Sequence, residues 1–225
     1  MYAFATGGGK FHSPNGYELT IKKPYIVLGH RWKKKMVYST TKIEPIGNNF
    51  PIIGSKTGSG DGYQTLVMVC DMGGIKVAGA IMNAADEKGR FDAMDELMRI
   101  GYKVLHKHAE VKNMSVTKAR NASLCMMDEK GSIKHIFTQN ADEVSAPMST
   151  TKVMTMMIAN RYIKDFNRNE YIIPSDLRNE NGDVLHAWDK LSIKDMMAAM
   201  VISSSNVAAN AIARIAGIEI LKIKR

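Results

Sequence analysis

The chain has 225 residues, of which 45% are hydrophobic and 24% are charged, so it can bury a sizeable core and is not intrinsically disordered. Its net charge of +9 suits an anionic polymer or membrane surface, but the cations are scattered and no helix-turn-helix, zinc-finger or RNA-recognition pattern accompanies them, which argues against a nucleic-acid partner. No run approaches the roughly 18 consecutive apolar residues of a membrane span, and residues 1–10 lack the apolar core of a secretory signal.

Runs rich in β-branched and apolar residues predict the strands of an antiparallel sheet. The expected strands are residues 50–59, 65–71, 75–82, 122–128 and 132–137. A Met-Gly-Gly turn joins the second and third of them, and a Glu-Lys-Gly turn joins the last two. Between the third and fourth strands, residues 86–105 carry apolar residues at helical spacing, which gives this helix a face able to cover the sheet.

Further helices are expected at residues 149–162, 192–200 and 206–216, where they would form a helical lobe. The predicted fold class is therefore α+β, with a five-stranded antiparallel sheet covered by helices, in one catalytic domain that spans residues 1–225.

Cysteine and histidine residues give no sign of a cofactor site. Cys70 and Cys125 each lie in an apolar strand outside any Cys-x-x-Cys pair, so we expect two buried thiols, or a disulfide if their strands are neighbours. The six histidines form no metal signature, and His106-x-His108 is the nearest approach to one. Neither a metal nor another cofactor is predicted.

The first chemical motif is Ser149-Thr150-Thr151-Lys152. Residues three apart share one face of a helix, so the Lys152 amine is expected to reach the Ser149 hydroxyl. A serine is a poor nucleophile without a base, and a lysine whose pKa is lowered by burial can take its proton. The alternative for the isolated motif is a helix N-cap at Ser149 and a solvated Lys152.

Two more motifs change the interpretation of the first. Ser204-Ser205-Asn206 follows an apolar run, and Lys56-Thr57-Gly58-Ser59 ends an apolar segment. Alone, they would be a helix cap and a strand end with a turn. Ser-x-x-Lys, Ser-x-Asn and Lys-Thr-Gly together are the three elements of the penicillin-recognising serine enzymes.

The surroundings of these motifs resemble a serine-type D-alanyl-D-alanine carboxypeptidase of the β-lactamase/transpeptidase-like superfamily. Residues 121–217 resemble the first part of that family, and residues 11–105 its later part, with residues 13–16 similar to the family's Asn-Pro-x-Gly loop. Lys-Thr-Gly comes last in the family but first here. The chain is therefore predicted to be a circular permutant in which residues 103–120 link the original ends, which commonly lie close together at a domain surface.

The resemblance implies a cleft between the sheet and the helical lobe, with three catalytic residues. Ser149 would attack the peptide carbonyl, Lys152 would be its base, and Ser204 would relay a proton to the leaving amine. The backbone N–H groups of Ser149 and Ser59 would form the oxyanion hole.

The same resemblance implies a set of substrate-binding residues. Asn206 would hold a substrate amide and help to position Lys152. Lys56 and Thr57 would bind the terminal carboxylate, one by charge and one by a hydrogen bond, and Gly58 would let a ligand approach the strand edge closely.

Implied partners are a peptidoglycan stem peptide ending in D-Ala-D-Ala and β-lactams as covalent inhibitors, at an extracytoplasmic site beside the membrane or cell wall. A serine β-lactamase is the nearest alternative, but in the best-known class it needs a glutamate after Ser-x-Asn. In wrapped order that region is residues 218–225 and 1–10, which contain Glu219 as their sole acid and no Glu-x-x-x-Asn pattern. A non-catalytic wall-binding protein and a basic nucleic-acid module are further alternatives.

Overall fold

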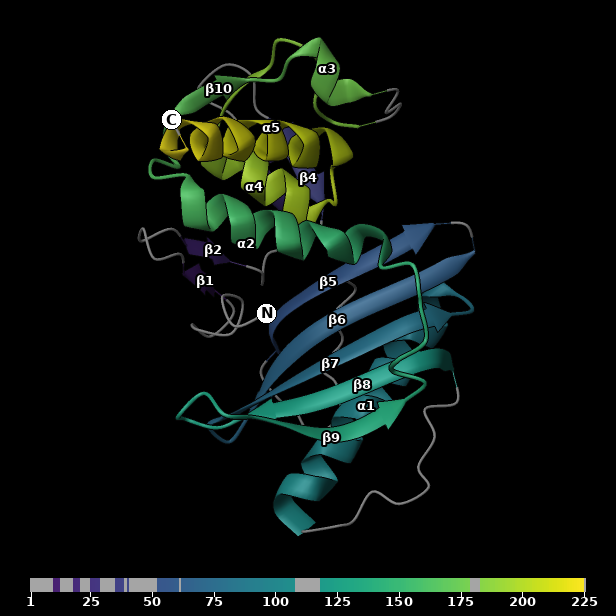
Figure 1. Cartoon of the computed structure of the whole chain (residues 1–225). Coiled ribbons are helices and arrows are strands. Elements are labelled where there is room, and N and C mark those ends of the chain that lie inside the picture. The colour runs from purple at the N-terminus through teal and green to yellow at the C-terminus, as the bar shows by residue number, and fades with distance from the viewer. Residues whose placement is uncertain are drawn as a thin grey trace. The chain divides into compact units, whose positions relative to one another are not determined.

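The computed structural model describes residues 10–12, 18–20, 25–28, 35–38, 40, 52–60, 62–107, 118–178 and 183–224. The chain divides into two compact units, each assembled from two separate stretches of sequence (Figure 1). Unit 1 comprises Met1–Lys10 and Lys42–Thr150, and unit 2 comprises Phe11–Thr41 and Thr151–Arg225. The predicted loop at residues 13–16 and the basic residues 31–34 lie outside the described residues.

Unit 1 is built on a five-stranded antiparallel sheet with the strand order β5-β6-β7-β8-β9 (Figure 1). The strands are β5 (Ile52–Gly60), β6 (Tyr63–Met72), β7 (Ile75–Ala84), β8 (Ala119–Met127) and β9 (Ile133–Gln139). The predicted α+β class and five-stranded sheet are confirmed, and each strand begins and ends within a few residues of its expected position.

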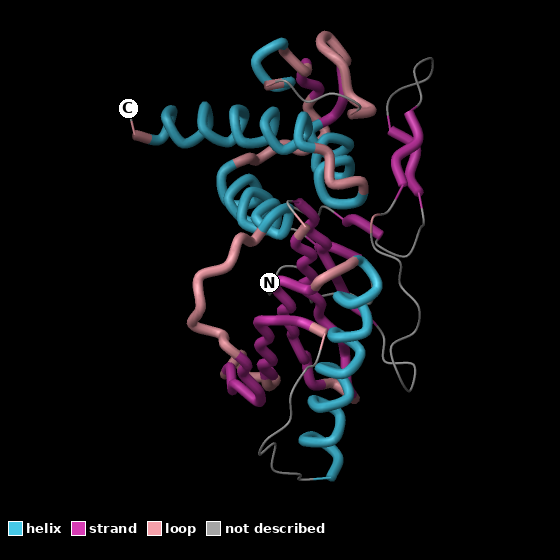
Figure 2. The backbone as a smooth tube through the Cα atoms, turned by 90° about the vertical axis from the view of Figure 1, so that its right-hand side faces the viewer, coloured by secondary structure: helices cyan, strands magenta, loops and turns pink. Residues whose placement is uncertain are grey.

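Helix α1 (Glu87–Lys107) covers one face of this sheet (Figure 2). Its buried residues Met94, Leu97 and Met98 join a core cluster with sheet residues such as Leu66 and Leu124. Removing these side chains from water is the main stabilising contribution to unit 1, at about 25 cal/mol per Å² of apolar surface.

Strands β7 and β8 are neighbours in the sheet although α1 separates them in the chain, with Met82 opposite Asn121. Regular structure occupies both ends of the predicted linker 103–120, because α1 continues to Lys107 and β8 begins at Ala119. The linker assignment itself stays a prediction.

The two cysteines lie on strands that are not neighbours. Cys70 is on β6 and Cys125 is on β8, β7 lies between these strands, and both thiols are free. Burial raises the pKa of the Cys70 thiol to about 12 and also raises the pKa of Cys125. Both groups are therefore protonated and chemically quiet at neutral pH.

Unit 2 is mostly helical. Its helices are α2 (Lys152–Tyr162), α3 (Pro174–Leu177), α4 (Ile193–Ile202) and α5 (Asn206–Ile223), and α2, α3 and α4 each pack against α5. The short strand pairs are β1 (Lys10–His12) with β2 (Glu18–Thr20), β3 (Tyr25–Leu28) with β4 (Lys35–Tyr38), and β10 (Asn169–Tyr171) with β11 (Lys190–Ser192). Buried residues of α4, such as Met196 and Met200, supply much of this core.

Helix α5 is longer than expected. The sequence predicts that it ends at residue 216, but it passes through Gly217 and continues to Ile223. Nothing lies within 4 Å of a Cβ atom placed on Gly217, and Glu219 pairs with Lys222 one turn further on. A glycine that faces open space costs a helix only about 1 kcal/mol, so the continuing helical pattern outweighs it.

Among the described residues, no helix is both long and apolar enough to span a membrane. The same part of the chain contains no group of three or more His, Cys, Asp or Glu residues that could hold a metal ion.

Candidate active site

The predicted site residues fall into two groups, because the division between the two units lies between Thr150 and Thr151. Unit 1 contains Ser149 and the Lys-Thr-Gly strand. Unit 2 contains Lys152 and the Ser-x-Asn turn.

Ser149 lies in a 3₁₀ turn, η2 (Met148–Thr151), and α2 begins only at Lys152. The sequence predicts an α-helix from Ser149, and the difference has a local cause. The Thr150 backbone N–H donates to the Pro147 oxygen at 3.1 Å, and the Thr150 hydroxyl donates to the same oxygen. This i to i−3 bond closes a 3₁₀ turn instead of an α-helical one.

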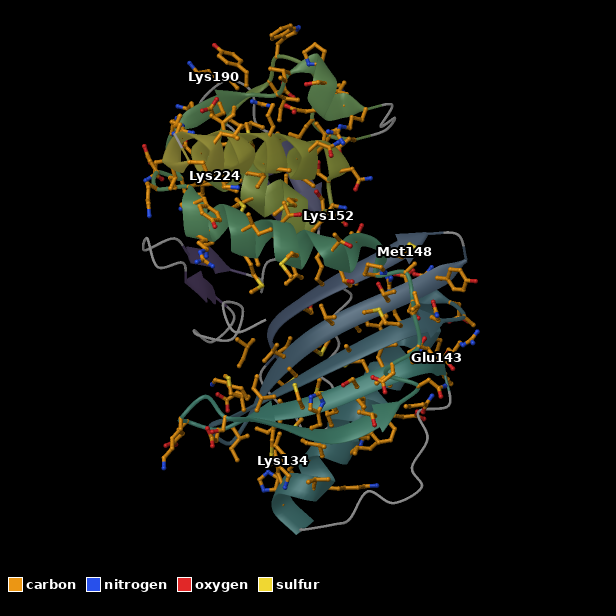
Figure 3. The ribbon with its side chains drawn as sticks, in the orientation of Figure 1. Lys134, Glu143, Met148, Lys152, Lys190 and Lys224 are labelled. Carbon is orange, nitrogen blue, oxygen red and sulfur yellow. The ribbon has the colours of Figure 1, made fainter. Side chains whose placement is uncertain are left out.

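The backbone directly before Ser149 is strained. Met148 has φ = 48°, a left-handed conformation that non-glycine residues rarely adopt. Its side chain lies beside the end of β5 (Figure 3). Such conformations persist only where the surroundings over-determine them, and they concentrate at functional sites.

Gly58 brings the Lys-Thr-Gly strand against this turn. A Cβ atom at Gly58 would lie 2.9 Å from the Ser149 backbone nitrogen and 2.9 Å from Met148 Cβ, and it would also collide with Thr65 Oγ1. Thr65 Oγ1 in turn donates to the Pro147 oxygen at 3.3 Å. The close neighbour of Gly58 is therefore the chain's own nucleophile turn, so glycine is required there whether or not a ligand is bound.

Lys56 and Thr57 are almost wholly buried in β5, with exposed fractions of 1% and 3%. Lys56 Nζ donates to the Thr57 backbone oxygen at 2.8 Å. A buried ammonium must be hydrogen-bonded, so this bond helps to hold a cation inside the strand next to Gly58.

In unit 2, Lys152 lies at the start of α2 (Figure 3) and is 6% exposed. Lys152 Nζ donates to Asn206 Oδ1 at 2.5 Å and to Ser204 Oγ at 3.4 Å. All three predicted residues of this unit therefore meet, with Asn206 the closer partner. A buried lysine beside a serine hydroxyl and an amide oxygen is suited to proton transfer.

The Ser-x-Asn turn is fixed by its neighbours. Ser204 has φ = 62°, and Ser205 caps α5 by accepting the Ala208 N–H at 2.9 Å. The Ser205 hydroxyl donates to Asp183 Oδ2 at 2.7 Å. Sequence reasoning does not find Asp183, because a single acid in a loop has no distinguishing pattern.

A family model described as D-alanyl-D-alanine carboxypeptidase matches residues 108–219, about half of the chain. The chain belongs to this family. The matched stretch contains Ser149, Lys152, Ser204 and Asn206 but not Lys56 or Gly58. Members of the D-alanyl-D-alanine carboxypeptidase family are serine hydrolases. No curated protein and no solved structure matches the chain.

In this carboxypeptidase-family chain, Arg90 on α1 is a second residue that the sequence analysis misses. It is 3% exposed, and its Nη1 donates to Gly58 O at 3.0 Å, Ser59 Oγ at 2.8 Å and Gln64 Oε1 at 2.8 Å. Burial lowers the pKa of the guanidinium, and nearby Glu87 opposes that effect. Arg90 therefore holds the end of the Lys-Thr-Gly strand from the α1 side. No signal in the sequence separates it from the solvated cations of the same helix.

Proposed function

We propose that this protein is a serine D-Ala-D-Ala carboxypeptidase that releases the terminal D-alanine of peptidoglycan stem peptides through an acyl-enzyme on Ser149. The observation that carries the proposal is the approach of Gly58 to the Ser149 backbone nitrogen within unit 1. These residues belong to motifs that are far apart in the sequence and that stand in a different order from that of the family. The packing of a sheet and helices does not by itself require the two motifs to meet. The Lys152, Ser204 and Asn206 cluster gives separate support.

The proposed reaction has two steps. Ser149 Oγ attacks the carbonyl carbon of the penultimate D-alanine while neutral Lys152 takes the hydroxyl proton. The C–N bond then breaks, the leaving amine receives a proton relayed through Ser204, and free D-alanine departs. Water hydrolyses the ester and regenerates Ser149.

Substrate recognition is assigned to the strand residues. Lys56 supplies a fixed positive charge and Thr57 a hydroxyl for the substrate's terminal carboxylate. The backbone N–H groups of Ser149 and Ser59 stabilise the oxyanion, and one such donor contributes about 2.7–4 kcal/mol in other acyl-transfer enzymes. Asn206 binds a substrate amide and also positions Lys152.

Circular permutation is part of the proposal. It is supported by a family match that stops at residue 219 and excludes the Lys-Thr-Gly strand, although that strand belongs to the same sheet as the matched β8 and β9. A rearranged chain that starts at Lys118, runs to Arg225 and continues from Met1 to Lys107 should fold and react like the original. A rearranged chain that is folded but unreactive would contradict the permutation.

The family is typically extracytoplasmic. We assign this chain to the same location, with stem peptides as substrate and β-lactams as covalent inhibitors. Its net charge of +9 suits work beside an anionic wall polymer.

The β-lactamase alternative gains no support from Glu219. Hydrogen bonds from Lys222 and Arg168 lower the pKa of this carboxylate, and its Oε1 lies 3.1 Å from Arg168 Nη2. A carboxylate that two cations hold in the ionised form is a weak base for activating water.

The deciding experiment is intact mass spectrometry after incubation with a penicillin. We expect a stable adduct of one penicillin on the native protein and none on Ser149→Ala, followed by D-alanine release from a D-Ala-D-Ala peptide. If the native protein forms no adduct and releases no D-alanine, the function proposed here is wrong. Rapid turnover of the penicillin would instead favour the β-lactamase.

A further inference from the structure

The segment that leads to Ser149 has little packing of its own. Residues 140–144 are exposed, Val144 is fully exposed, and Ala146 and Pro147 are also exposed. This segment nevertheless has to deliver Met148 in its left-handed conformation to a turn packed on Gly58. Something other than apolar burial must therefore fix it.

Asn121, at the start of β8, fixes it by hydrogen bonds. This side chain is 4% exposed. Its Oδ1 accepts from Ser145 Oγ at 2.8 Å and from Asn83 Nδ2 at 3.1 Å. Its Nδ2 donates to Asn140 O at 2.9 Å and to Glu143 Oε2 at 3.4 Å, and Glu143 lies near the start of β8 (Figure 3). All four hydrogen-bonding positions of one buried amide are thus occupied.

Three of the four partners lie in the exposed segment, so the amide ties both ends of it to the sheet. Two partners, Asn83 and Asn140, also have left-handed backbones, with φ = 55° and 47°. Asparagine tolerates that conformation better than most residues, but it still needs support from its surroundings. The hydrogen bonds of Asn121 supply that support. The last residue that they hold, Ser145, lies two residues before Pro147.

We propose that Asn121 is a positioning residue for catalysis: its buried amide holds residues 140–145 so that the strained turn at Met148 presents Ser149 correctly. It touches no substrate and acts through Ser145 and the backbone. The inference rests on the function proposed above, because it assumes that Ser149 is the nucleophile.

The sharpest test is Asn121→Asp, which keeps size and shape but replaces the Nδ2 donor with an oxygen. That oxygen would face the Asn140 carbonyl and the Glu143 carboxylate and repel both. The rate constant of acylation at saturating penicillin should fall about tenfold to hundredfold per folded molecule, because small displacements of reacting groups cost that much. Thermal unfolding reports the folded fraction.

A compensating change identifies the cause. In Asn121→Asp with Glu143→Gln, the new side-chain amide can donate to the introduced carboxylate, so much of the lost rate should return. Gln139→Glu is the matched control: Gln139 Nε2 donates to the backbone oxygens of Ala119 at 2.8 Å and of Arg120 at 3.5 Å, at the same end of the sheet. Its acylation rate should stay within about twofold of the native rate.

Hydrogen exchange of residues 145–150 gives a readout independent of chemistry. Faster exchange there in Asn121→Asp, but not in Gln139→Glu, is the expected result.

If the native protein is never acylated, the proposed function fails and the exchange comparison decides the positioning role alone. If Asn121→Asp does not fold, Ser145→Ala removes two bonds of the network, from Ser145 Oγ to Asn121 Oδ1 and from Asn83 Nδ2 to Ser145 Oγ, and should slow acylation by a smaller factor. A folded Asn121→Asp or Ser145→Ala protein with native acylation and native exchange would overturn the proposal.

Discussion

The two units hold their predicted site residues by different physical means. In unit 1, Ser149 is held by close packing against the Lys-Thr-Gly strand, where a Cβ atom at Gly58 would lie 2.9 Å from the Ser149 backbone nitrogen. In unit 2, Lys152 is held by side-chain hydrogen bonds to Asn206 and Ser204. The first arrangement is sensitive to added volume and the second to lost polarity, so each unit should fail under the change that the other tolerates.

Gly58→Ala should break the unit 1 arrangement and have the largest effect. The added methyl group would collide with Thr65 Oγ1 and lie 2.9 Å from the Ser149 nitrogen, so the turn has to move. We expect acylation by penicillin to fall about 100-fold and the free energy of unfolding to fall by about 1–3 kcal/mol.

Gly60→Ala is the matched control on the same strand. Its Cβ atom would lie 3.1 Å from Met148 Sδ, a flexible side-chain atom that can give way. Acylation close to the native rate is expected. Equal losses in the two variants would mean that alanine harms this strand in general and that the Gly58 contact has no special role.

Asn206→Ala should break the unit 2 arrangement and have the second-largest effect. It removes the closer oxygen partner of Lys152, which becomes an ammonium as it takes the Ser149 proton. A hydrogen bond to a charged group contributes about 1.5–3 kcal/mol, or roughly 10-fold to 150-fold in rate. Asn210→Ala, one turn further along α5, removes the bond to Asp176 O and should lower the melting temperature without slowing acylation. Native acylation by Asn206→Ala would remove Asn206 from the mechanism.

Arg90→Met tests whether packing alone holds the unit 1 site, because Arg90 adds hydrogen bonds at the end of a strand that is otherwise held by packing. The variant loses three hydrogen bonds at the strand end but keeps the Gly58 contact. We expect a smaller loss of about tenfold in acylation. Arg99→Met, which removes an exposed pair with Asp95 on the same helix, should leave the rate unchanged. A change of the same size in both variants would indicate an effect of helix charge.

A prediction with no effect at neutral pH concerns the pH dependence of unit 1, where both cysteines lie. The folded pKa of Cys70 is about 12 against a reference of 9.0, so the unfolded chain loses this proton first as pH rises. The Cys70 contribution to stability is complete below about pH 9 and is lost between pH 9 and about 12. The free energy of unfolding of the native protein and of Cys70→Val can be compared by urea unfolding at each pH. Over that range the native protein should lose stability relative to Cys70→Val, and a constant difference between the two would contradict the raised pKa.

Much of the fold could be predicted because it repeats a local pattern. Runs of β-branched and apolar residues and the Met-Gly-Gly and Glu-Lys-Gly turns indicate the strands, and apolar spacing of three to four indicates α1. The boundaries are less predictable where long-range pairing decides them. β8 begins at Ala119 because that residue pairs with Ala84, and Arg120 joins the strand with its charge satisfied by Glu143.

The motifs indicate Ser149, Lys152 and Asn206, but their supports come from distant parts of the chain. Arg90, Asp183 and Asn121 each act through partners more than 18 positions away. An arginine, an aspartate and an asparagine are common on any surface, and only the fold shows that two of these three are nearly fully buried. The 3₁₀ turn at Ser149 also depends on a local bond to Pro147 that spacing does not reveal.

Strand β7 has a consequence for how the covalent structure responds to oxidation. Because it lies between the strands of Cys70 and Cys125, their Cα atoms are two strand spacings apart, about 9.6 Å or more. A disulfide needs Cα atoms within about 7 Å, so an intramolecular bridge could form only after the ladder had opened. The folded chain should therefore form no disulfide between its own two cysteines under oxidising conditions, so no internal cross-link ties its stability to the redox potential of its surroundings.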